Sequence, residues 1–360
     1  MTKIGDRSIL QTEYPERPAR RPGHPRRLAL FFVAVLLCGG LAAEAGATVL
    51  KMATLAPDGS SLMVALREGA DEITRRTEGR VRFQFYPGGT MGNDQAVLRR
   101  MRIGQLHGGA LTAGGLTTVY PDLQVYNLPV LFRSYEEVDH VRSRIDPVLL
   151  RGLEEKGFVG FGMVDSGFAY LLSARPARNV ADLRSAKPWI PEGDTIGEAI
   201  FAAGGISPVP LPLTDVLTGL QTGLIDTVAA SPVAAVALQW FTRVRYLTDT
   251  PLLYTYGIIV IQKRVFDRVA PADQAVVREV LERVSKELDR RVRADNEAAW
   301  DALLAQGIEV VTPSPEDRQA WFATAATATS RLAAQGAFSR TVHQQVEELL
   351  QQYRKTRTTP

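Results

Sequence analysis

Cysteine is almost absent from this 360-residue chain, and histidine is scarce. The single cysteine, Cys38, lies in a segment that we expect to be removed. The rest of the chain can therefore form no disulfide and offers no thiolate for catalysis or metal binding. The histidines that follow it lie far apart and form no metal-binding motif: His107, His140 and His343.

Motifs of common catalytic and nucleotide-binding centres are missing as well. The chain has no G-x-S-x-G nucleophile elbow, no Walker loop and no G-x-G-x-x-G fingerprint. Residues 165–167 (DSG) are the nearest approach to a nucleophile turn, but no histidine is recognisably placed to serve it. We therefore expect a protein that is not an enzyme and that needs no cofactor and no metal ion.

Charge is balanced once the N-terminus is set aside. The chain carries 42 Lys and Arg and 39 Asp and Glu, of which residues 1–47 hold 7 and 4, so the remainder carries 35 of each sign. A nucleic-acid-binding protein needs a net basic surface, so we expect no nucleic-acid partner. Apolar residues make up 45% of the chain, which is usual for a soluble globular protein.

The first 47 residues form a predicted signal peptide. Arginines between residues 17 and 27 precede an apolar run at residues 28–37, and small residues then lead to an A-x-A site that ends at Ala47. The apolar run is shorter than the roughly 20 residues that span a bilayer. We therefore expect cleavage after about Ala47 and export into the periplasm.

Alternatives for this segment stay open. An uncleaved segment would anchor the protein in the membrane. Acylation of Cys38 would make a lipoprotein, although Leu37 stands before it where a small residue is usual. Arg26 and Arg27 suggest twin-arginine export, but their flanking residues fit it poorly. The long basic region also leaves open a start codon further downstream.

Strand and helix patterns alternate after residue 48. Alternating or continuous apolar stretches predict strands, and apolar spacings of three and four predict helices. We expect strands at residues 49–54, 81–86, 106–112, 162–172 and 256–262. We expect helices at residues 61–77, 95–103, 197–203, 214–221 with Thr214 as N-cap, and 272–306, with a terminal helix at 344–357. This alternation predicts an α/β fold with mainly parallel sheets.

Two segments of the chain resemble each other. Residues 101–110 and 220–229 each run from a helix end through a glycine into a small apolar strand. Gly104 and Gly223 stand where the end of a helix needs left-handed backbone. This similarity is consistent with two similar α/β halves, and equally with a common type of helix-to-strand connection.

Four motifs occur in an order and spacing that are typical of one family. Residues 85–92 (FYPGGTMG) are similar to F-P-G-G-x-L-G, and residues 128–132 (LPVLF) are similar to L-P-F-L-F. Residues 182–191 (DLRSAKPWIP) resemble D-L-K-G-L-K-I-R-V-P, and residues 211–226 resemble P-x-P-F-x-E-V-Y-x-A-L-Q-T-G-V-V-D. From about residue 49 to 315, the chain resembles the substrate-binding subunit of TRAP (tripartite ATP-independent periplasmic) transporters.

The resemblance implies a two-lobed periplasmic binding protein fold with discontinuous domains, a hinge and a long bridging helix. It places lobe 1 at residues 48–167 with about 255–294, lobe 2 at 168–254 with about 295–345, and a C-terminal tail at 346–360. It also implies a receptor that captures a small organic ligand between the lobes. The receptor would deliver this ligand to the small and large membrane subunits of a transporter.

The positions at which the family binds carboxylates are changed in this chain. The resemblance puts Trp189 where the family has an arginine, whose two-donor fork clamps a substrate carboxylate. A second family arginine follows an N-G-F segment, whereas here Ala169 follows S-G-F. The family's polar E-N-P is replaced by residues 229–232 (AASP). We therefore expect a ligand that is less charged or more hydrophobic than the usual carboxylates.

Aromatic residues near these positions suit such a ligand, because they supply a large apolar contact with one polar tip. The candidate ligand-binding residues are Trp189, Phe168, Ser166, Ala169, Tyr170, Ser231, Trp240, Tyr254, Tyr256, Asp58 and Asn93. One alternative is a carrier or sensor of the same fold that is not coupled to transport. Another is uptake of a C4-dicarboxylate or other organic acid, with Arg243 or Arg245 as the substitute cation.

Overall fold

The computed structural model describes residues 47–358. The predicted signal peptide, with Cys38, lies outside the described residues except for Ala47. Within the described part, no helix combines the length and the apolar character needed to cross a membrane.

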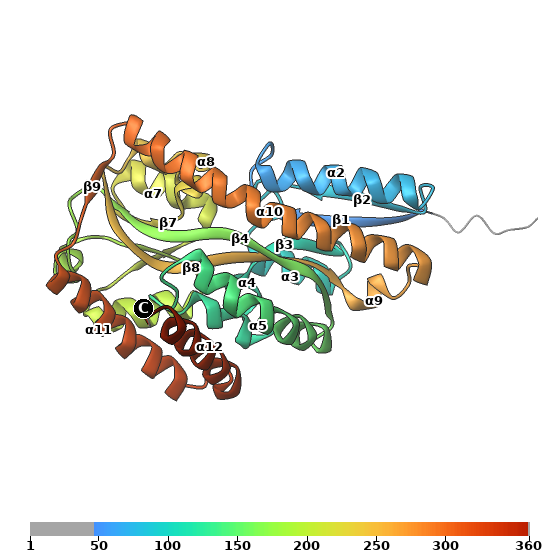
Figure 1. The fold of residues 1–360 in the computed structure, drawn as a ribbon. Helices are drawn as coiled ribbons and strands as arrows, with labels where there is room; N and C mark the ends of the chain where they lie inside the picture. The colour runs from blue at the N-terminus through green and yellow to red at the C-terminus, as the bar shows by residue number, and fades with distance from the viewer. Residues whose placement is uncertain (1–46, 359–360) are drawn as a thin grey trace, which may run out of the picture. The chain divides into compact units, whose positions relative to one another are not determined.

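Strands and helices alternate along the chain, as predicted (Figure 1). The strands are β1 (Thr48–Thr54), β2 (Val81–Tyr86), β3 (Gly108–Thr112), β4 (Phe158–Ser173), β5 (Trp189–Pro191), β6 (Val209–Leu211), β7 (Thr227–Ala230), β8 (Tyr246–Gln262) and β9 (Glu309–Val311). The α-helices are α2 (Ser61–Arg76), α3 (Asp94–Arg102), α4 (Ala113–Leu116), α5 (Tyr135–Glu155), α6 (Thr195–Gly204), α7 (Val216–Thr222), α8 (Pro232–Ala237), α9 (Lys263–Phe266), α10 (Pro271–Ala305), α11 (Pro315–Ala334) and α12 (Arg340–Thr358).

One mixed sheet organises the described residues. Its strand order is β2-β1-β3-β8-β4-β7, and β9 pairs with β8. β1 runs parallel to β2 and β3, whereas β8 is antiparallel to β3 and β4, and β4 is antiparallel to β7. β5 and β6 form a separate parallel pair, which a bridge between Pro188 and Thr227 joins to β7. The α/β class is confirmed, and the sheet is mixed at its centre.

The strands β4 and β8 pair along most of their length. They contain 16 and 17 residues and span about 50 Å at roughly 3.3 Å per residue. Their pairing shifts register at three places, one of which lies between Asp165 and Gly167. Such irregularities bend a strand. This pair therefore runs through the whole sheet and is bent near the middle of β4.

Successive side chains of β4 and β8 point to opposite faces of the sheet, and this divides the core into clusters. Ile258 and Val260 pack with α5 and α12, whereas Ile259 and Ile261 pack with α2 and α10 on the other face. Further along, Leu171 and Leu172 likewise enter different clusters, each with its own helices. The two-residue period of a strand explains this division. The predicted lobe boundaries stay a prediction.

The long helix predicted at 272–306 is confirmed as α10, which is continuous over 35 residues. The apolar positions that predicted it are all buried: Val277, Val280, Val284, Leu288 and Val292. α10 packs against β4, α2 and α8, so it contacts both ends of the sheet (Figure 1). The terminal helix is also present as α12, and its buried residues join the cluster that contains α5.

The predicted helix ends are partly correct. Gly104 and Gly223 both have left-handed backbone, with φ of 76° and 70°, as the end of each helix requires. The prediction that Thr214 caps a helix is wrong. Thr214 lies in a 3-10 turn (Leu213–Asp215), and α7 begins after it at Val216. The hydroxyl of Thr214 donates to Asp215 instead of accepting from the helix backbone.

Candidate ligand-binding site

The bent middle of β4 carries four of the candidate residues. Ser166 is half-buried, and Phe168 and Ala169 are buried. The ring of Phe168 lies 5.0 Å from that of Tyr135, on α5. Tyr170 lies on the same side of the strand two residues on, and its ring contacts Trp300 of α10 at 5.1 Å. Both aromatic rings are therefore held by helices that pack on the sheet.

Trp189 is the first residue of β5 and is only 6% exposed. Its ring meets Trp240 edge to face at 5.2 Å, and its Nε1 donates to the carbonyl oxygen of Leu211 at 2.9 Å. Burial of an indole N–H requires such a partner. The polar edge of Trp189 is thus used inside the protein, and the remainder of the ring is an apolar wall.

Tyr254, Tyr256 and Trp240 lie deeper than we expected. Each is at most 2% exposed. The hydroxyl of Tyr254 accepts from Arg142, and that of Tyr256 donates to the carbonyl oxygen of Leu123. The hydroxyls of the two tyrosines are thus bound to protein atoms, and all three rings are buried. They are core residues in this structure, and their role in lining a ligand pocket stays a prediction.

Asp58 and Asn93 have structural partners. Asp58 is exposed and paired with Arg67, which holds the pKa of its carboxyl below the usual value mainly through the hydrogen bond between them. Asn93 caps α3, because its side chain accepts from the N–H of Ala96 at 3.0 Å. Both lie in turns that follow the carboxyl ends of β1 and β2, the edge at which α/β sheets bind ligands.

Asp94 is a buried acid that sequence reasoning missed. One of its oxygens accepts from the hydroxyl of Thr112 at 2.6 Å and from the backbone N–H of the same residue at 3.1 Å. Its other oxygen has no partner among the described residues. Burial raises the pKa of Asp94. The signal available in the sequence was its place directly after the N-cap Asn93, where an acid suits the helix dipole.

Two motifs that are distant in the sequence meet in the fold. A Cβ added at Gly89 would lie 3.0 Å from the methyl group of Thr214 and 3.4 Å from Leu55. Gly89 belongs to the turn after β2, and Thr214 belongs to the segment before α7. The turn after β2, at the carboxyl end of the parallel strands, thus contacts the segment that leads into α7. Gly89 has a φ of 71°, so glycine is needed there for backbone as well as space.

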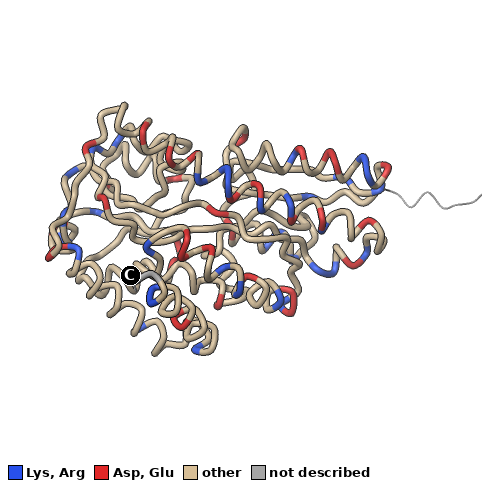
Figure 2. The backbone as a smooth tube through the Cα atoms, in the orientation of Figure 1, with Lys and Arg blue, Asp and Glu red and all other residues tan. Residues whose placement is uncertain are grey.

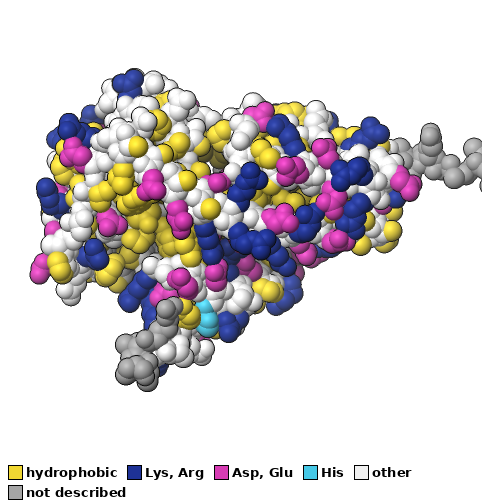
Figure 3. All heavy atoms as spheres, turned by 45° about the horizontal axis from the view of Figure 1, so that its top comes forward, with side chains coloured by type: hydrophobic (Ala, Val, Ile, Leu, Met, Phe, Trp, Pro, Cys, Tyr) yellow, Lys and Arg dark blue, Asp and Glu magenta, His cyan; other side chains and the backbone are white. Residues whose placement is uncertain are grey.

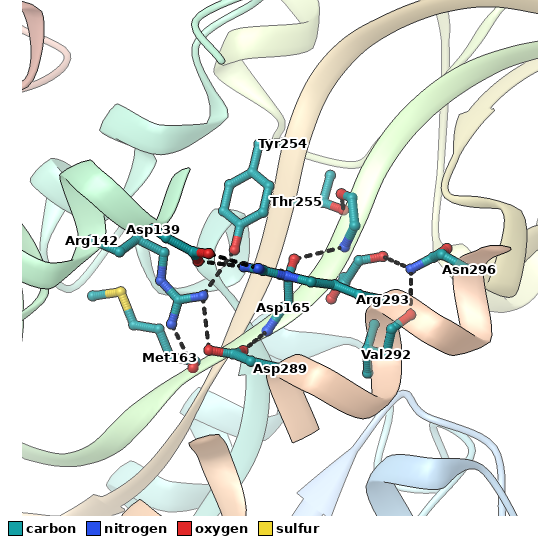
Figure 4. A network of polar contacts seen from close by, with 12 residues as sticks. Asp139, Arg142, Met163, Asp165, Tyr254, Thr255, Asp289, Val292, Arg293 and Asn296 are labelled. Carbon is teal, nitrogen blue, oxygen red and sulfur yellow. Dashed lines mark hydrogen bonds and ion pairs between the residues drawn. The ribbon is translucent and has the colours of Figure 1, made fainter. Parts of the chain in front are cut away.

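A network of buried and partly buried charges, with the exposed Asp139 at its edge, surrounds the bend of β4 (Figure 4). Arg293 of α10 pairs with Asp165 of β4 and Asp139 of α5. Arg142 of α5 pairs with Asp289 of α10 at 3.1 Å, and Asp289 accepts from the backbone N–H of Asp165 at 2.7 Å. Burial raises the pKa of Asp289 to about 6, although Arg142 opposes this shift.

Sequence patterns did not predict this network, because its members come from three separate elements, α5, β4 and α10. The one available signal was polar residues on the apolar face of α10, where Asp289, Arg293 and Asn296 follow each other at spacings of four and three. Charged residues on a buried face need partners. Arg142 and Arg293 have carboxylate partners, so neither guanidinium is free to bind an anion.

The segment that contains Trp189 and Ser231 carries no cation. Residues 188–242, which include β5, β7, α7 and α8, contain no Lys or Arg. Figure 2 shows this segment of the chain almost free of colour, whereas both signs of charge crowd α2 and α10. On the left half of the face in Figure 3, hydrophobic side chains gather among white ones, with a few charges between them. The carboxylates of the segment are Glu192, Asp194, Glu198, Asp215 and Asp226.

The two arginines considered as substitutes lie just beyond that segment. Arg245 is exposed and pairs with Glu309 of β9 at 2.8 Å, so its charge is already matched. Arg243 is exposed and follows the 3-10 turn Trp240–Thr242. No hydrogen bond or ion pair of Arg243 is found among the described residues beyond its backbone N–H.

Comparison with known proteins identifies the family. The family model of bacterial extracellular solute-binding proteins, family 7, matches residues 52–335. The 2,3-diketo-L-gulonate-binding periplasmic protein of Escherichia coli (strain K12) is 26% identical over 255 residues, which cover 69% of this chain and 76% of that protein. The sialic acid-binding periplasmic protein of Vibrio cholerae is 22% identical over 79% of this chain and 89% of its own.

Solved structures show the same fold. A TRAP periplasmic solute-binding protein from Xanthobacter autotrophicus Py2, with bound β-D-galacturonate, has a TM-score of 0.77 and 22% identity, covering 84% of this chain and 99% of its own. These findings confirm the TRAP resemblance and the expectation of a binding protein instead of an enzyme. The chain belongs to the bacterial extracellular solute-binding protein family 7 and is a TRAP solute-binding protein, a periplasmic receptor.

Proposed function

We propose that this receptor captures a neutral or weakly charged organic ligand with a substantial apolar surface, and that it delivers the ligand to the small and large membrane subunits of a TRAP transporter. The ligand-facing residues would be Trp189, Phe168, Ser166 and Ser231; Ala169 is left out because it is 2% exposed. We leave out Tyr254, Tyr256 and Trp240 because they are core residues.

The absence of a cation from residues 188–242 is the observation that carries this proposal. A carboxylate that leaves water needs a cation or several hydrogen-bond donors to offset the cost of desolvation. Here the position of the family's arginine holds Trp189, whose single N–H is already bound to Leu211. A carboxylate ligand buried against Trp189 would therefore find no cation in this segment to offset its desolvation.

The proposed site lies where β4 bends between the two predicted lobes. Ligand binding would close lobe 1 on lobe 2 about β4 and β8, in the manner of hinge closure. The contact between Gly89 and Thr214 would then belong to the closed form. Signal peptide cleavage after about Ala47 would release the receptor into the periplasm.

A first experiment separates the ligand classes. The protein is purified from the periplasm, and native mass spectrometry identifies any molecule that dissociates on denaturation. Thermal shifts are then measured with D-glucuronate and with N-phenyl-1-naphthylamine, a neutral aromatic probe. We expect the neutral probe to raise the melting temperature by a few degrees, because a ligand that binds only the folded state stabilises it. A larger shift with D-glucuronate would contradict the proposal.

Substitution of Trp189 tests whether its ring contacts the ligand. W189R should weaken binding of N-phenyl-1-naphthylamine by about tenfold or more, because it buries a charge in place of apolar surface. W189F is the matched control, since it keeps an apolar ring and removes only the N–H bond to Leu211. Unchanged affinity in W189R would remove Trp189 from the site.

Uptake of an organic acid is the second candidate function. It is favoured by the exposed Arg243, whose guanidinium has no partner among the described residues. The solved structure with bound β-D-galacturonate agrees with it. If D-glucuronate binds, R243A should abolish that binding, whereas R245A should not, because Arg245 is paired with Glu309.

A further inference from the structure

The helix α8 begins in an unusual way. Ser231 occupies its N-cap position, yet the side chain makes no capping hydrogen bond. A serine there ordinarily accepts from a backbone N–H two or three residues further on. Here the N–H of Val233 donates to Oδ1 of Asn296, on α10, at 3.1 Å. A side chain from another helix thus caps α8.

The same amide holds the bend of β4. Nδ2 of Asn296 donates to the carbonyl oxygen of Val292 at 3.0 Å and, more weakly, to that of Ser166 at 3.4 Å (Figure 4). Asn296 is 6% exposed. Its position also explains Gly167, because a Cβ there would lie 2.5 Å from Nδ2. One buried amide therefore joins two segments that are far apart in the sequence.

Both segments belong to the ligand site proposed above. Ser166 precedes Phe168 and Ala169, and Val233 follows Ser231 by two residues. Because Asn296 supplies the cap, the hydroxyl of Ser231 is left without a hydrogen-bond partner among the described residues. Among mostly apolar side chains, a free hydroxyl can orient a ligand that carries a hydroxyl, carbonyl or amine group.

We infer that Asn296 is a positioning residue of the ligand site: it caps α8 in place of Ser231, leaves the Ser231 hydroxyl to the ligand, and fixes the bend of β4 beside it. This inference rests on the proposed function for the location of the site. The ligand class that it adds is a largely apolar molecule with one hydrogen-bonding group directed at Ser231.

Amide hydrogen exchange of the whole protein, followed by NMR, tests the capping role without any ligand. In the wild-type protein the Val233 amide should be protected. S231A should leave that protection unchanged, and N296A should speed exchange by about tenfold or more, because one capping bond is lost. N296D should restore protection, since a carboxylate also accepts this bond. If S231A loses the protection of the Val233 amide and N296A keeps it, the inference is overturned.

Probe binding tests the effect on the site. N296A should weaken N-phenyl-1-naphthylamine by about tenfold, with partial recovery in N296D. S285A is the matched control, because Ser285 is also buried on α10 and donates to β4, at the carbonyl oxygen of Phe161, 2.9 Å away. S285A should lower stability and leave affinity within about twofold.

The outcomes separate the two proposals. Equal loss of affinity in N296A and S285A would show that Asn296 has a merely structural role, and the inference would fail. If the probe does not bind the wild-type protein, the neutral-ligand proposal fails, while amide exchange still decides which residue caps α8.

Discussion

At the scale of single residues, a side chain's partners decide what it can offer a ligand. Trp189 stands at an arginine position of the family, and its N–H is bound inside the protein. Ser231 shows the opposite case, because its expected role as a cap is taken by Asn296. Neither outcome follows from residue type alone, since each depends on an atom from a distant part of the chain.

Asp289 predicts a pH dependence of stability. Its pKa rises from the usual 3.8 to about 6 through burial, although Arg142, Arg293 and the backbone N–H of Asp165 oppose the shift and the Asp165 carboxylate adds to it. The folded form therefore binds more protons than the unfolded form between these pH values. The contribution of Asp289 to the free energy of unfolding should then increase as pH falls from 7 to 4, by at most about 3 kcal/mol.

The measurement is urea unfolding of wild type and D289N across that pH range. D289N keeps an acceptor for the N–H of Asp165 and cannot titrate. The difference in unfolding free energy between the two proteins should therefore change with pH and level off above about pH 7. Parallel curves would show that Asp289 does not titrate in this window.

At the scale of elements, β4 and α10 act together. The apolar pattern predicted α10 closely, because its buried positions repeat at helical spacing over its length. The bend of β4 was not predictable in the same way. It depends on Asp289, Arg293 and Asn296 of α10 contacting the backbone and side chains near Asp165. Contacts between elements leave no periodic trace in a sequence.

Gly167 tests how firmly α10 holds the bend. Two features oppose a side chain at Gly167. Its φ is 92°, and an added Cβ would lie 2.5 Å from Nδ2 of Asn296. G167A should lower the free energy of unfolding by about 2–4 kcal/mol. G157A is the control, because Gly157 has a φ of 89° and no atom near its missing Cβ. It should cost about 1 kcal/mol, from backbone strain alone. If G167A and G157A lose the same free energy of unfolding in urea, the side chain of Asn296 moves aside at little cost.

At the scale of the whole described chain, its end returns to a core formed by earlier elements. We expected a C-terminal tail at 346–360 with a terminal helix at 344–357, and the structure shows α12 with Val346 and Leu350 buried in the cluster that includes α5. Arg354 adds a pair with Glu137 of α5 at 2.7 Å, which lowers the pKa of that glutamate against the effect of its burial.

Leu350 measures how much α12 contributes. L350A removes a side chain that is 2% exposed and should cost about 2–5 kcal/mol of unfolding free energy. Q345A, at an exposed position of the same helix, should change it by less than about 0.5 kcal/mol. Thermal or urea unfolding gives both values. If L350A leaves the free energy of unfolding unchanged, α12 is dispensable for the core.

The sequence by itself determined the family, the alternation of strands and helices, the long helix and the absence of cysteine from the described chain. These properties follow from local patterns and ordered motifs, which a linear chain displays. Only the tertiary structure decided that Tyr254 and Tyr256 are core, that Arg142 and Arg293 are paired, and that Asn296 caps α8. Burial and partnership are set by residues brought together from distant segments, so no local pattern specifies them.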